Sequence, residues 1–363
     1  MTAQGDNLTA SAQSHITQVG AALDAAWARA TASGEARVLD LAADRYIIFS
    51  DQHRGIRNGA DDFQRCERVY NAALAYYFHR GYTLVVLGDV EELWEERPAA
   101  VLRAYPRTLD LEAQFHRGGR YVRLWGNHDD EWQYADSVRR HLQPVYGDPP
   151  LCIDESLRLI VTEGTAELGT LFLLHGHQGD AVSGRWSGGA RFFVRYFWRT
   201  FQRLTGISLN TPATSGDLRH KYNQAMDAWA VQQSRLVLIA GHTHAPVFKF
   251  QTQEACLTAA IERLESAVPQ SDAALEAVSL WRAQREWAAA PDQPLPRLES
   301  TPPLTKPCYF NTGCCCFSTG DITGIEIAQG QIRLVRWPDE THQPGPSILA
   351  RAALREVLAE CQG

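Results

Sequence analysis

No apolar run in the sequence approaches the roughly 18 to 20 residues that a membrane-spanning helix needs. The first residues lack a charged start followed by an apolar stretch, so we expect no secretory signal. The formal net charge of −7 argues against nucleic-acid binding through the whole surface. We therefore expect a cytoplasmic protein without a stable nucleic-acid partner. The sequence also lacks internal repeats and heptads, which excludes a solenoid or a coiled coil.

The eight cysteines do not suggest a disulfide framework, because they are scattered and no export signal accompanies them. Three of them are consecutive, at positions 314–316. A soft-metal site is one interpretation of this triplet. Adjacent residues of a strand point to opposite faces, however, so three neighbours cannot converge on one ion. We therefore interpret the triplet as small, buried apolar side chains.

Five short apolar runs each lead into residues of the kinds that bind metal ions. The runs are residues 46–49, 84–87, 121–125, 171–174 and 236–239, and they lead into Asp-Gln-His, Gly-Asp, Gly-Asn-His-Asp, His-Gly-His and Gly-His-Thr-His. Because the carboxyl ends of strands in an α/β sheet border one crevice, we expect these side chains to meet there. Carboxylate, amide and imidazole groups in this combination are typical of a two-metal hydrolytic centre.

The chain between these motifs predicts alternating strands and helices. Strands are expected at 46–50, 83–87 and 120–125, with a hairpin at 157–162 and 170–174; helices are expected at 8–32, 64–80, 91–96 and 98–117. This order argues for parallel pairing at the core. Later strands at 307–311, 321–328 and 331–337 suggest a second sheet packed on the first, and a helix at 347–360 closes the chain.

These elements predict one large domain with additions. Its expected parts are an N-terminal helical segment (1–40), a central domain (41–340), helical insertions at about 181–233 and 252–304, and a C-terminal helix (341–363). The first insertion lies between two of the metal-type motifs, which favours a substrate cap.

The ordered motifs resemble the calcineurin-like metallophosphoesterase superfamily, whose pattern is D-x-H, G-D-x-x-D, G-N-H-D/E, a separate His and G-H-x-H. The resemblance covers residues 46–246 and implies a four-layer αββα sandwich. By position, it implies one ion held by Asp51, His53, Asp89 and His244, and a second held by Asp89, Asn127, His175 and His242. The donor set suits two divalent transition ions among manganese, iron, zinc and nickel, and we favour manganese.

The resemblance also implies the reaction. A hydroxide that bridges the two ions would attack phosphorus in line, and His128 would steady or protonate the leaving oxygen. The family usually has Asp three positions after the bridging Asp89, where it orients the catalytic His. This chain has Glu92 there, one methylene longer, and we expect it to reach His128.

Within the superfamily, the sequence around Asp51 and His175 looks most like UDP-2,3-diacylglucosamine pyrophosphohydrolases. Those enzymes commonly have Arg in place of His128 and Asp in place of His177, and they are shorter. The departures weaken the implied substrate, a nucleotide-linked lipid, and leave the phosphoesterase interpretation intact. His177 is an alternative ligand to His175, which we prefer because it directly follows the apolar run.

Three arginines are candidates for substrate binding. Arg54 follows the first motif and suits planar recognition of a phosphate, although an ordinary surface role is an equal alternative. Arg195 and Arg199 lie in an aromatic-rich stretch, 191–203, with arginines four residues apart. Such spacing predicts a cationic stripe on one helix face. It fits a lid over a lipid or nucleotide substrate, a peripheral contact with an anionic membrane, or a helix packed on the core.

The function that we predict is hydrolysis of a phosphodiester or pyrophosphate. One alternative is a phosphomonoesterase acting on small molecules or proteins. A second is a non-catalytic scaffold of the same fold, which we favour less because every ligand position is filled.

Overall fold

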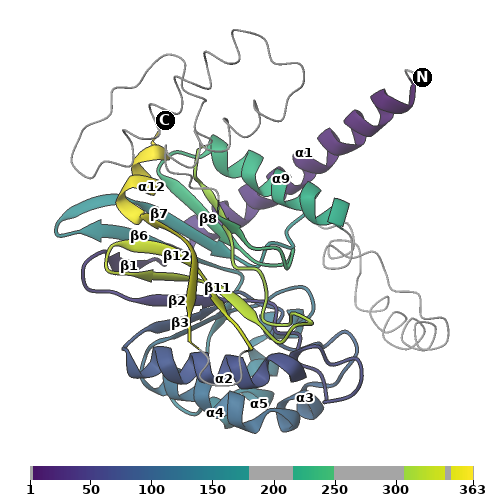
Figure 1. Cartoon of the computed structure of the whole chain (residues 1–363), viewed down its shortest axis with the longest axis vertical. Coiled ribbons are helices and arrows are strands. Elements are labelled where there is room, and N and C mark those ends of the chain that lie inside the picture. The colour runs from purple at the N-terminus through teal and green to yellow at the C-terminus, as the bar shows by residue number, and fades with distance from the viewer. Residues whose placement is uncertain (1–2, 180–215, 249–305, 340–344, 363) are drawn as a thin grey trace. The chain divides into compact units, whose positions relative to one another are not determined.

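Two β-sheets lie face to face, with helices on both outer faces, in the computed structural model (Figure 1). The structure describes residues 3–179, 216–248, 306–339 and 345–362. Every helix and strand in these ranges belongs to one unit, formed by Met1–Phe248 and Cys308–Gly363. The order of layers is helix, sheet, sheet, helix, so the predicted four-layer arrangement is confirmed.

The first sheet has seven strands among the described residues, and the strands on one side of it are parallel. In spatial order they are β13 (Ser347–Ala353), β12 (Gln331–Trp337), β11 (Ile322–Ala328), β2 (Tyr46–Phe49), β3 (Thr83–Val86), β4 (Tyr121–Leu124) and β5 (Ile153–Asp154). Strands β2 to β5 pair in parallel, with Ile48 opposite Val85 and Val85 opposite Val122. Parallel strands are covered on both faces, which explains why their sequences are continuous apolar runs.

The second sheet has six strands in the described part of the chain. In spatial order they are β1 (Arg37–Asp40), β6 (Ser156–Glu163), β7 (Ala166–Leu174), β8 (Leu236–Ala240), β10 (Tyr309–Asn311) and β9 (Val247–Phe248). The predicted hairpin is confirmed as β6 and β7, which pair antiparallel. Strands β7 and β8 are parallel, so their carboxyl ends reach the same edge of the sheet.

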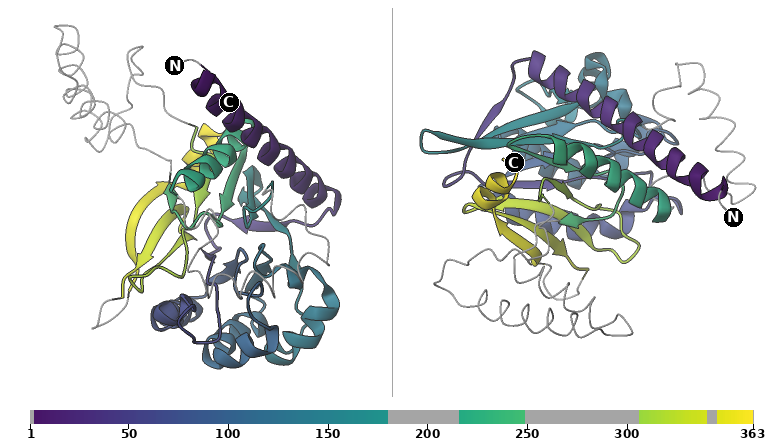
Figure 2. Two further views of the ribbon diagram at one scale, coloured as in Figure 1. Left: turned by 90° about the vertical axis from the view of Figure 1, so that its right-hand side faces the viewer. Right: turned by 90° about the horizontal axis from the view of Figure 1, so that it is seen from above.

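Helices cover the outer face of each sheet (Figures 1 and 2). The helices of the described chain are α1 (Ala3–Ala32), α2 (Phe63–His79), α3 (Pro98–Ala104), α4 (Pro106–Arg117), α5 (Ala135–His141), α6 (Gln143–Tyr146), α9 (Gly216–Gln232) and α12 (Leu354–Glu360), with a 3-10 turn at Asp130–Gln133. Helix α12 contacts strands of both sheets. Helices α2 and α4 lie against the first sheet. Helices α1 and α9 lie side by side on the second, joined by a 2.7 Å hydrogen bond from Trp229 Nε1 to Asp24 Oδ1.

The predicted grouping of the later strands was correct for 307–311, which contains β10 of the second sheet, and wrong for 321–328 and 331–337. Strands β11 and β12 extend the first sheet, because β11 pairs antiparallel with β2 and places Ile325 opposite Ile48. The hairpin β6–β7 with β8 and β10 forms the core of the second sheet instead. Alternation of apolar residues identifies a strand but carries no information about which distant strand it pairs with.

Three predicted helices also differ from the structure. The predicted C-terminal helix begins only at Leu354, because residues 347–353 pair with β12 as an edge strand. The predicted helix 98–117 divides at Tyr105, where Pro106 lacks the N–H that would continue the first helix. Residues 91–96 form turns rather than a helix, and the N-terminal segment ends in strand β1.

The predicted insertions lie largely outside the described residues. Of the segment 181–233, the structure describes the part from Gly216 onward, which is helix α9 and the approach to β8. The segment 252–304 lies outside them entirely. Within the described ranges, no helix combines the length and the apolar character that crossing a membrane would require.

Candidate metal centre

All seven predicted metal ligands follow the carboxyl ends of five strands, and the structure brings six of them together. Strands β2, β3 and β4 of the first sheet and β7 and β8 of the second supply them. The ligand atoms of Asp51, His53 and His244 lie within 4.8 Å of one another, and so do those of Asp89, His175 and His242. Each group contains three of the four residues in one of the ligand sets that the resemblance implied, and a third group joins His53, Asp89 and His128. The seventh residue, Asn127, is buried, at 5% exposure.

The two carboxylate oxygens of Asp51 have different roles: Oδ2 is held by hydrogen bonds, and Oδ1 faces the histidines of the centre. Oδ2 accepts hydrogen bonds from Ser50 Oγ and, at 3.0 Å, from the backbone N–H of His242. Oδ1 lies 3.2 Å from His244 Nε2 and 3.8 Å from His53 Nε2. Burial alone would raise the pKa of Asp51, but His244 and His175 hold it well below its usual range. Asp51 therefore presents one charged oxygen to the centre.

Asp89 is placed between the two groups. Its Oδ1 accepts the backbone N–H of His128 at 2.8 Å. Its Oδ2 lies 3.0 Å from His175 Nε2 and 3.7 Å from His53 Nε2. One carboxylate oxygen thus faces an imidazole from each group, which is the position that a bridging ligand occupies.

Three of the four histidines are oriented through the ring nitrogen that points away from the centre. Nδ1 of His53 lies 3.2 Å from Glu92 Oε2, and Nδ1 of His175 lies 3.1 Å from the carbonyl oxygen of Leu87. Nδ1 of His244 lies 3.7 Å from Cys316 Sγ. Metal-binding histidines characteristically make such an outer contact, because it fixes the tautomer and turns Nε2 toward the ion.

Four buried polar atoms of the centre form no hydrogen bond of good geometry among the residues that the structure describes: Asp51 Oδ1, Asn127 Oδ1, His175 Nε2 and His242 Nε2. Asp51 Oδ1 and His175 Nε2 lie at ion-pair distance from His244 Nε2 (3.2 Å) and Asp89 Oδ2 (3.0 Å), so these two are partly satisfied. Asn127 Oδ1 and His242 Nε2 have no such contact, and burying a polar atom without a partner costs about 1–3 kcal/mol. Divalent ions would satisfy all four atoms, because every one of them carries a lone pair that a metal can accept.

One imidazole of the centre already has the protonation state that metal binding needs. Burial, together with the neighbouring His175, holds the pKa of His242 well below its ordinary value, so this imidazole is neutral and can donate its lone pair. Against the effect of burial, the neighbouring carboxylates raise the pKa values of His53, His175 and His244, so these three must release a proton when an ion binds. The combination of imidazole and carboxylate donors suits zinc, iron, manganese or nickel better than calcium. The side chains present therefore fit the pair of transition ions that the resemblance implied.

The backbone of the ligand loops is held in a conformation that L-residues rarely adopt. Asp51, His53, Asp89, His242 and His244 all have positive φ, between +50° and +65°. Such residues cost about 1–3 kcal/mol each and concentrate at functional sites. Positive φ at Asp51 and His53 also provides the bend that lets both side chains of the first motif face one ion.

Two glycines allow these loops to approach closely. A Cβ at Gly241 would collide with the side chains of Ser50 and Asp51, and one at Gly126 would collide with Asp89. Both glycines are therefore required by space. Gly241 follows β8 of the second sheet and lies against the first motif of the first sheet, and Gly126 lies against the second motif within the first sheet.

His128 stands at the rim of the centre, and its orientation is fixed by two contacts. Its Nδ1 lies 2.7 Å from Glu92 Oε2, which confirms that the longer Glu side chain reaches it. Its ring stacks on Trp94, with centroids 4.0 Å apart and an interplanar angle of 19°. The two nearby imidazoles, His128 first, lower the pKa of Glu92 to about 2 although burial would raise it. Glu92 is therefore ionised, and it holds His53 as well as His128.

Trp94 is a contributor that the sequence interpretation missed. Its Nε1–H donates to the carbonyl oxygen of Asn127 at 2.6 Å, so it fixes the third motif as well as the ring of His128. The only signal in the sequence is its place two residues after Glu92, which by itself does not separate it from a core tryptophan.

Asp129 fastens the second and third motifs to each other and is not aimed at the centre. Its Oδ1 accepts the backbone N–H of Gly126 at 2.7 Å and that of Asp89 at 3.1 Å. Its Oδ2 accepts Val90 N–H and Arg123 Nη2, both at 3.1 Å. We expect loss of this carboxylate to loosen both loops.

The structure corrects the expectation for Arg54. Its side chain is 1% exposed, and its guanidinium is bonded to both oxygens of Glu112 on α4. It also lies over the rings of Phe63 and Tyr70, at 5.2 and 5.6 Å from their centroids. Arg54 is therefore enclosed between loop and helix and does not reach a substrate phosphate.

The remaining candidates lie beside the centre or outside the described residues. His177 is 6% exposed, and its ring centroid lies 5.5 Å from that of His175. Burial and then His175 lower the pKa of His177 to about 3. The metal-binding groups of the described chain include His175 and not His177. Arg195 and Arg199 lie outside the described residues.

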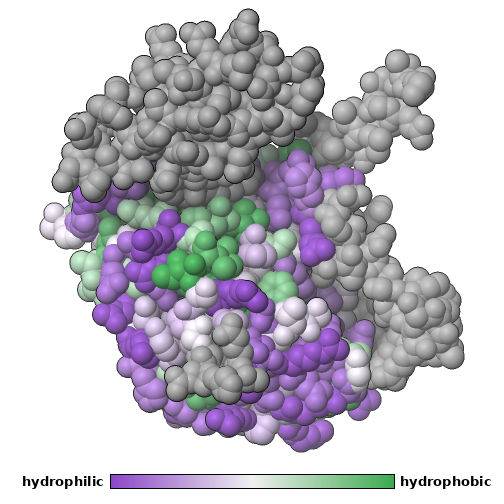
Figure 3. All heavy atoms as spheres, viewed as in Figure 1, coloured by the Kyte–Doolittle hydropathy of each residue, from purple (hydrophilic) through white to green (hydrophobic). Residues whose placement is uncertain are grey.

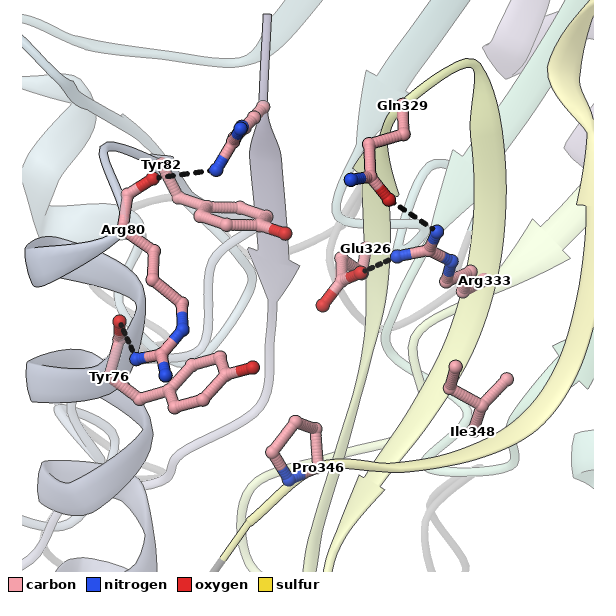
Figure 4. A pocket seen from close by; sticks show the side chains of 9 residues that line it. Tyr76, Arg80, Tyr82, Glu326, Gln329, Arg333, Pro346 and Ile348 are labelled. Carbon is pink, nitrogen blue, oxygen red and sulfur yellow. Dashed lines mark hydrogen bonds and ion pairs between the residues drawn. The ribbon is translucent and has the colours of Figure 1, made fainter.

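A separate cavity of about 350 Å³ opens at the other end of the first sheet (Figure 4). Arg45, Tyr82 and Arg333 line it, and Arg333 donates to Glu326 at 2.6 Å. Apolar surface gathers over β12 and β13 on this face (Figure 3), where Ile348 is 49% exposed. Because Arg45 and Tyr82 precede β2 and β3, whereas the metal ligands follow them, this cavity is distinct from the centre.

No family model and no curated protein matches the chain. Among solved structures, it is similar to vacuolar protein sorting 29 from Cryptosporidium parvum, with 9% identity, a TM-score of 0.31, and coverage of 85% of this chain and 98% of that chain. It is also similar to a predicted phosphoesterase from Streptococcus pneumoniae (11% identity, TM-score 0.27, 84% and 97% covered). A third similar structure is a single mutant of vacuolar protein sorting 29 from Entamoeba histolytica (12% identity, TM-score 0.29, 84% and 98% covered). At such TM-scores the likeness carries no argument about function.

Proposed function

We propose that this chain is a binuclear-metal phosphoesterase of the calcineurin-like superfamily that hydrolyses a phosphodiester or pyrophosphate bond. The observation that carries the proposal is the convergence of buried carboxylates and imidazoles in two groups, Asp51 with His53 and His244 and Asp89 with His175 and His242. Beside them, the buried atoms Asn127 Oδ1 and His242 Nε2 have no hydrogen-bond partner among the described residues. The order of the motifs and the αββα layers supports the family assignment.

When bound, a pair of divalent ions supplies Lewis acidity and an activated water to phosphoryl transfer. Asp51, His53, Asp89 and His244 would hold one ion, and Asp89, Asn127, His175 and His242 the other. Asp51, His53 and His175 need little rearrangement, because their outer hydrogen bonds already fix them. Manganese is the metal that we propose first.

His128 is the group that we assign to the leaving oxygen. Glu92 accepts a hydrogen bond from its Nδ1, so Nε2 is the nitrogen that can give or take a proton. Its side chain is 18% exposed, which leaves it accessible to a substrate. The stacked Trp94 prevents the ring from turning away. Glu92 acts through His128 and is a positioning residue.

Two nitrophenyl esters test the reaction class. We expect protein loaded with Mn²⁺ to turn over bis(p-nitrophenyl) phosphate with a higher kcat/KM than p-nitrophenyl phosphate. The reverse preference would support a phosphomonoesterase. Metal-loaded protein without activity on any tested ester would support a non-catalytic scaffold.

Asp89→Asn supplies the matched loss of function, because it keeps the volume and removes the bridging charge. Asp110→Asn is its control, since Asp110 lies on the surface with its side chain 65% exposed. We expect the first variant to lose activity and the second to retain it. Unchanged hydrolysis of every ester by Asp89→Asn would contradict the proposal.

For the substrate class, we propose a nucleotide-linked lipid, bound with a peripheral contact to the inner face of a membrane. The support is the resemblance of the sequence around Asp51 and His175 and the arginine and aromatic composition of 191–203, including Arg195 and Arg199. Deleting about 185–210 should spare activity on small esters and remove it on the lipid substrate. The intact protein should also bind anionic vesicles. Equal loss on both substrates would contradict a substrate cap.

A further inference from the structure

His244 faces a second group of metal-binding atoms on the far side of its ring. Its Nε2 lies 3.2 Å from Asp51 Oδ1, inside the centre described above. Its Nδ1 lies 3.7 Å from Cys316 Sγ. One ligand atom each from His244, Cys314 and Cys316 lie within 4.8 Å of one another. The two nitrogens of one imidazole therefore serve two different clusters.

The path of the chain after β10 explains why two of the three consecutive cysteines converge. The backbone N–H of Cys315 donates to the carbonyl oxygens of Ser50 and Asp51, both at 3.1 Å. Its Sγ points the other way, 4.0 Å from the carbonyl oxygen of Thr323. The chain bends at Cys315, and Cys314 and Cys316 on either side of it both present their sulfur atoms to His244. The first and third cysteines therefore meet while the second points away.

The spacing of these atoms suits a tetrahedral ion. With bonds of about 2.0 Å to nitrogen and 2.3 Å to sulfur, two such ligands of one zinc ion lie about 3.5 Å apart. The separation of 3.7 Å between Cys316 Sγ and His244 Nδ1 is close to that value. Cys314 is buried, whereas Cys316 is half-buried and gives the group a border with solvent. An ion can therefore enter without opening the core.

We propose that Cys314, Cys316 and Nδ1 of His244 form a binding site for a thiophilic cation, such as Zn²⁺, Cd²⁺ or Cu⁺. Thiolate and imidazole donors select these ions over manganese or magnesium. Binding releases the thiol protons and the proton on Nδ1, because the ligand atoms must be deprotonated. No fourth Cys, His, Asp or Glu of the described ranges joins the group, which leaves one position open to water.

Occupancy of this site alters the neighbouring centre, and this consequence, unlike the site itself, rests on the proposed function. An ion at Nδ1 takes the outer contact of His244 and changes the basicity of Nε2. Coupling between two sites is reciprocal, so a thiophilic ion would change the affinity of the first ligand set for manganese. Micromolar Cd²⁺ should inhibit ester hydrolysis by wild type more strongly than by Cys316→Ser.

Titration of the full-length protein with Cd²⁺, in the presence of Mn²⁺, tests the site directly. The readout is the ultraviolet charge-transfer absorption that forms when thiolates bind cadmium. We expect saturation in wild type at one Cd²⁺ per chain and loss of most of this absorption in Cys314→Ser and in Cys316→Ser. The exposed Cys152 provides the matched control, and Cys152→Ser should titrate like wild type.

Two outcomes would overturn the site. No absorption in wild type would mean that the thiols only accept a hydrogen bond from His244. Equal absorption in all four proteins would place the bound cadmium elsewhere.

Because Cys314→Ser alters a buried position, a measurement on wild type accompanies the variants. The rate of cysteine alkylation is measured by mass spectrometry of the peptides, with and without Cd²⁺. Cd²⁺ should slow the alkylation of Cys314 and Cys316 and leave the rate at Cys152 unchanged. Alkylation of all three at unchanged rates would also contradict the site. Neither readout requires hydrolysis, so a failure of the proposed function remains distinguishable from a failure of this site.

Discussion

The substitution Arg54→Met should lower the free energy of unfolding of the protein without weakening substrate binding. Arg54 and Glu112 are 1% and 0% exposed, and the guanidinium is bonded to both carboxylate oxygens. Glu112 also accepts hydrogen bonds from Tyr146 at 2.8 Å and from Tyr70 at 3.0 Å. Removing the arginine leaves a carboxylate buried with only these neutral donors.

The expected cost is about 3–5 kcal/mol, which is typical of breaking a buried ion pair from one side. At about 2–4 °C per kcal/mol, the thermal midpoint should fall on the order of 10 °C. The double variant Arg54→Met with Glu112→Leu removes both charges, and its loss should be much smaller than that of Arg54→Met. Arg139→Met is the surface control, since Arg139 and its partner Asp136 are both mostly exposed and such pairs contribute about 0–1 kcal/mol.

The assay is urea unfolding followed by far-ultraviolet circular dichroism, together with KM for a nitrophenyl ester at a temperature where the variant is folded. The structure predicts a lower midpoint concentration of urea and an unchanged KM. A variant within about 1 kcal/mol of wild type but with a raised KM would refute the reasoning. That result would return Arg54 to the role of a phosphate-binding residue.

Three further predictions concern single side chains. Glu92→Gln should lower kcat by about 10²–10⁴-fold and change the pH profile of kcat, because the amide holds the His128 ring less strongly than the carboxylate. Glu92→Asp should recover part of the loss. An unchanged kcat in Glu92→Gln would contradict the positioning role. Gly241→Ala should reduce metal content and cost about 1–3 kcal/mol in urea unfolding, since its Cβ collides with the first motif; wild-type metal content would contradict this. Burial alone raises the pKa of Glu112, but Arg54 and the hydrogen bond from Tyr146 hold it below the ordinary 4.5, so its stabilisation is complete above that pH and declines as acid is added. Acid unfolding of Glu112→Gln should therefore depend less on pH below 4.5 than that of wild type, and equal slopes would contradict the assignment.

The meeting of the ligand side chains of the centre could be predicted from sequence because the signal for each one is local. Each follows a short apolar run that predicts a buried strand, and parallel strands deliver their carboxyl ends to one edge. The division into two ligand sets that share Asp89 came from the resemblance to the superfamily, and the structure places Asp89 Oδ2 near both His53 and His175. The pairing of distant strands could not be predicted in this way, since nothing in the sequence of β11 indicates that it pairs with β2.

The errors came from residues whose partners lie far away in the chain. The place of Arg54 after a motif suggested substrate contact, but its partner Glu112 lies on α4, on a helix face that also carries the buried Leu109 and Ala113. The glutamate on this apolar helix face was the one feature of the sequence that could have indicated a buried partner for Arg54. The Cys triplet was judged as three neighbours, and the pair formed by its first and third members was overlooked.

Metal content of the protein as purified without chelator tests the central claim most directly. We predict about two divalent transition ions per folded chain of wild type, and a clear loss in Asp89→Asn, since both ligand sets include this carboxylate. Wild-type protein that is folded, contains less than about one ion per chain and takes up none when Mn²⁺ or Zn²⁺ is added would contradict the account.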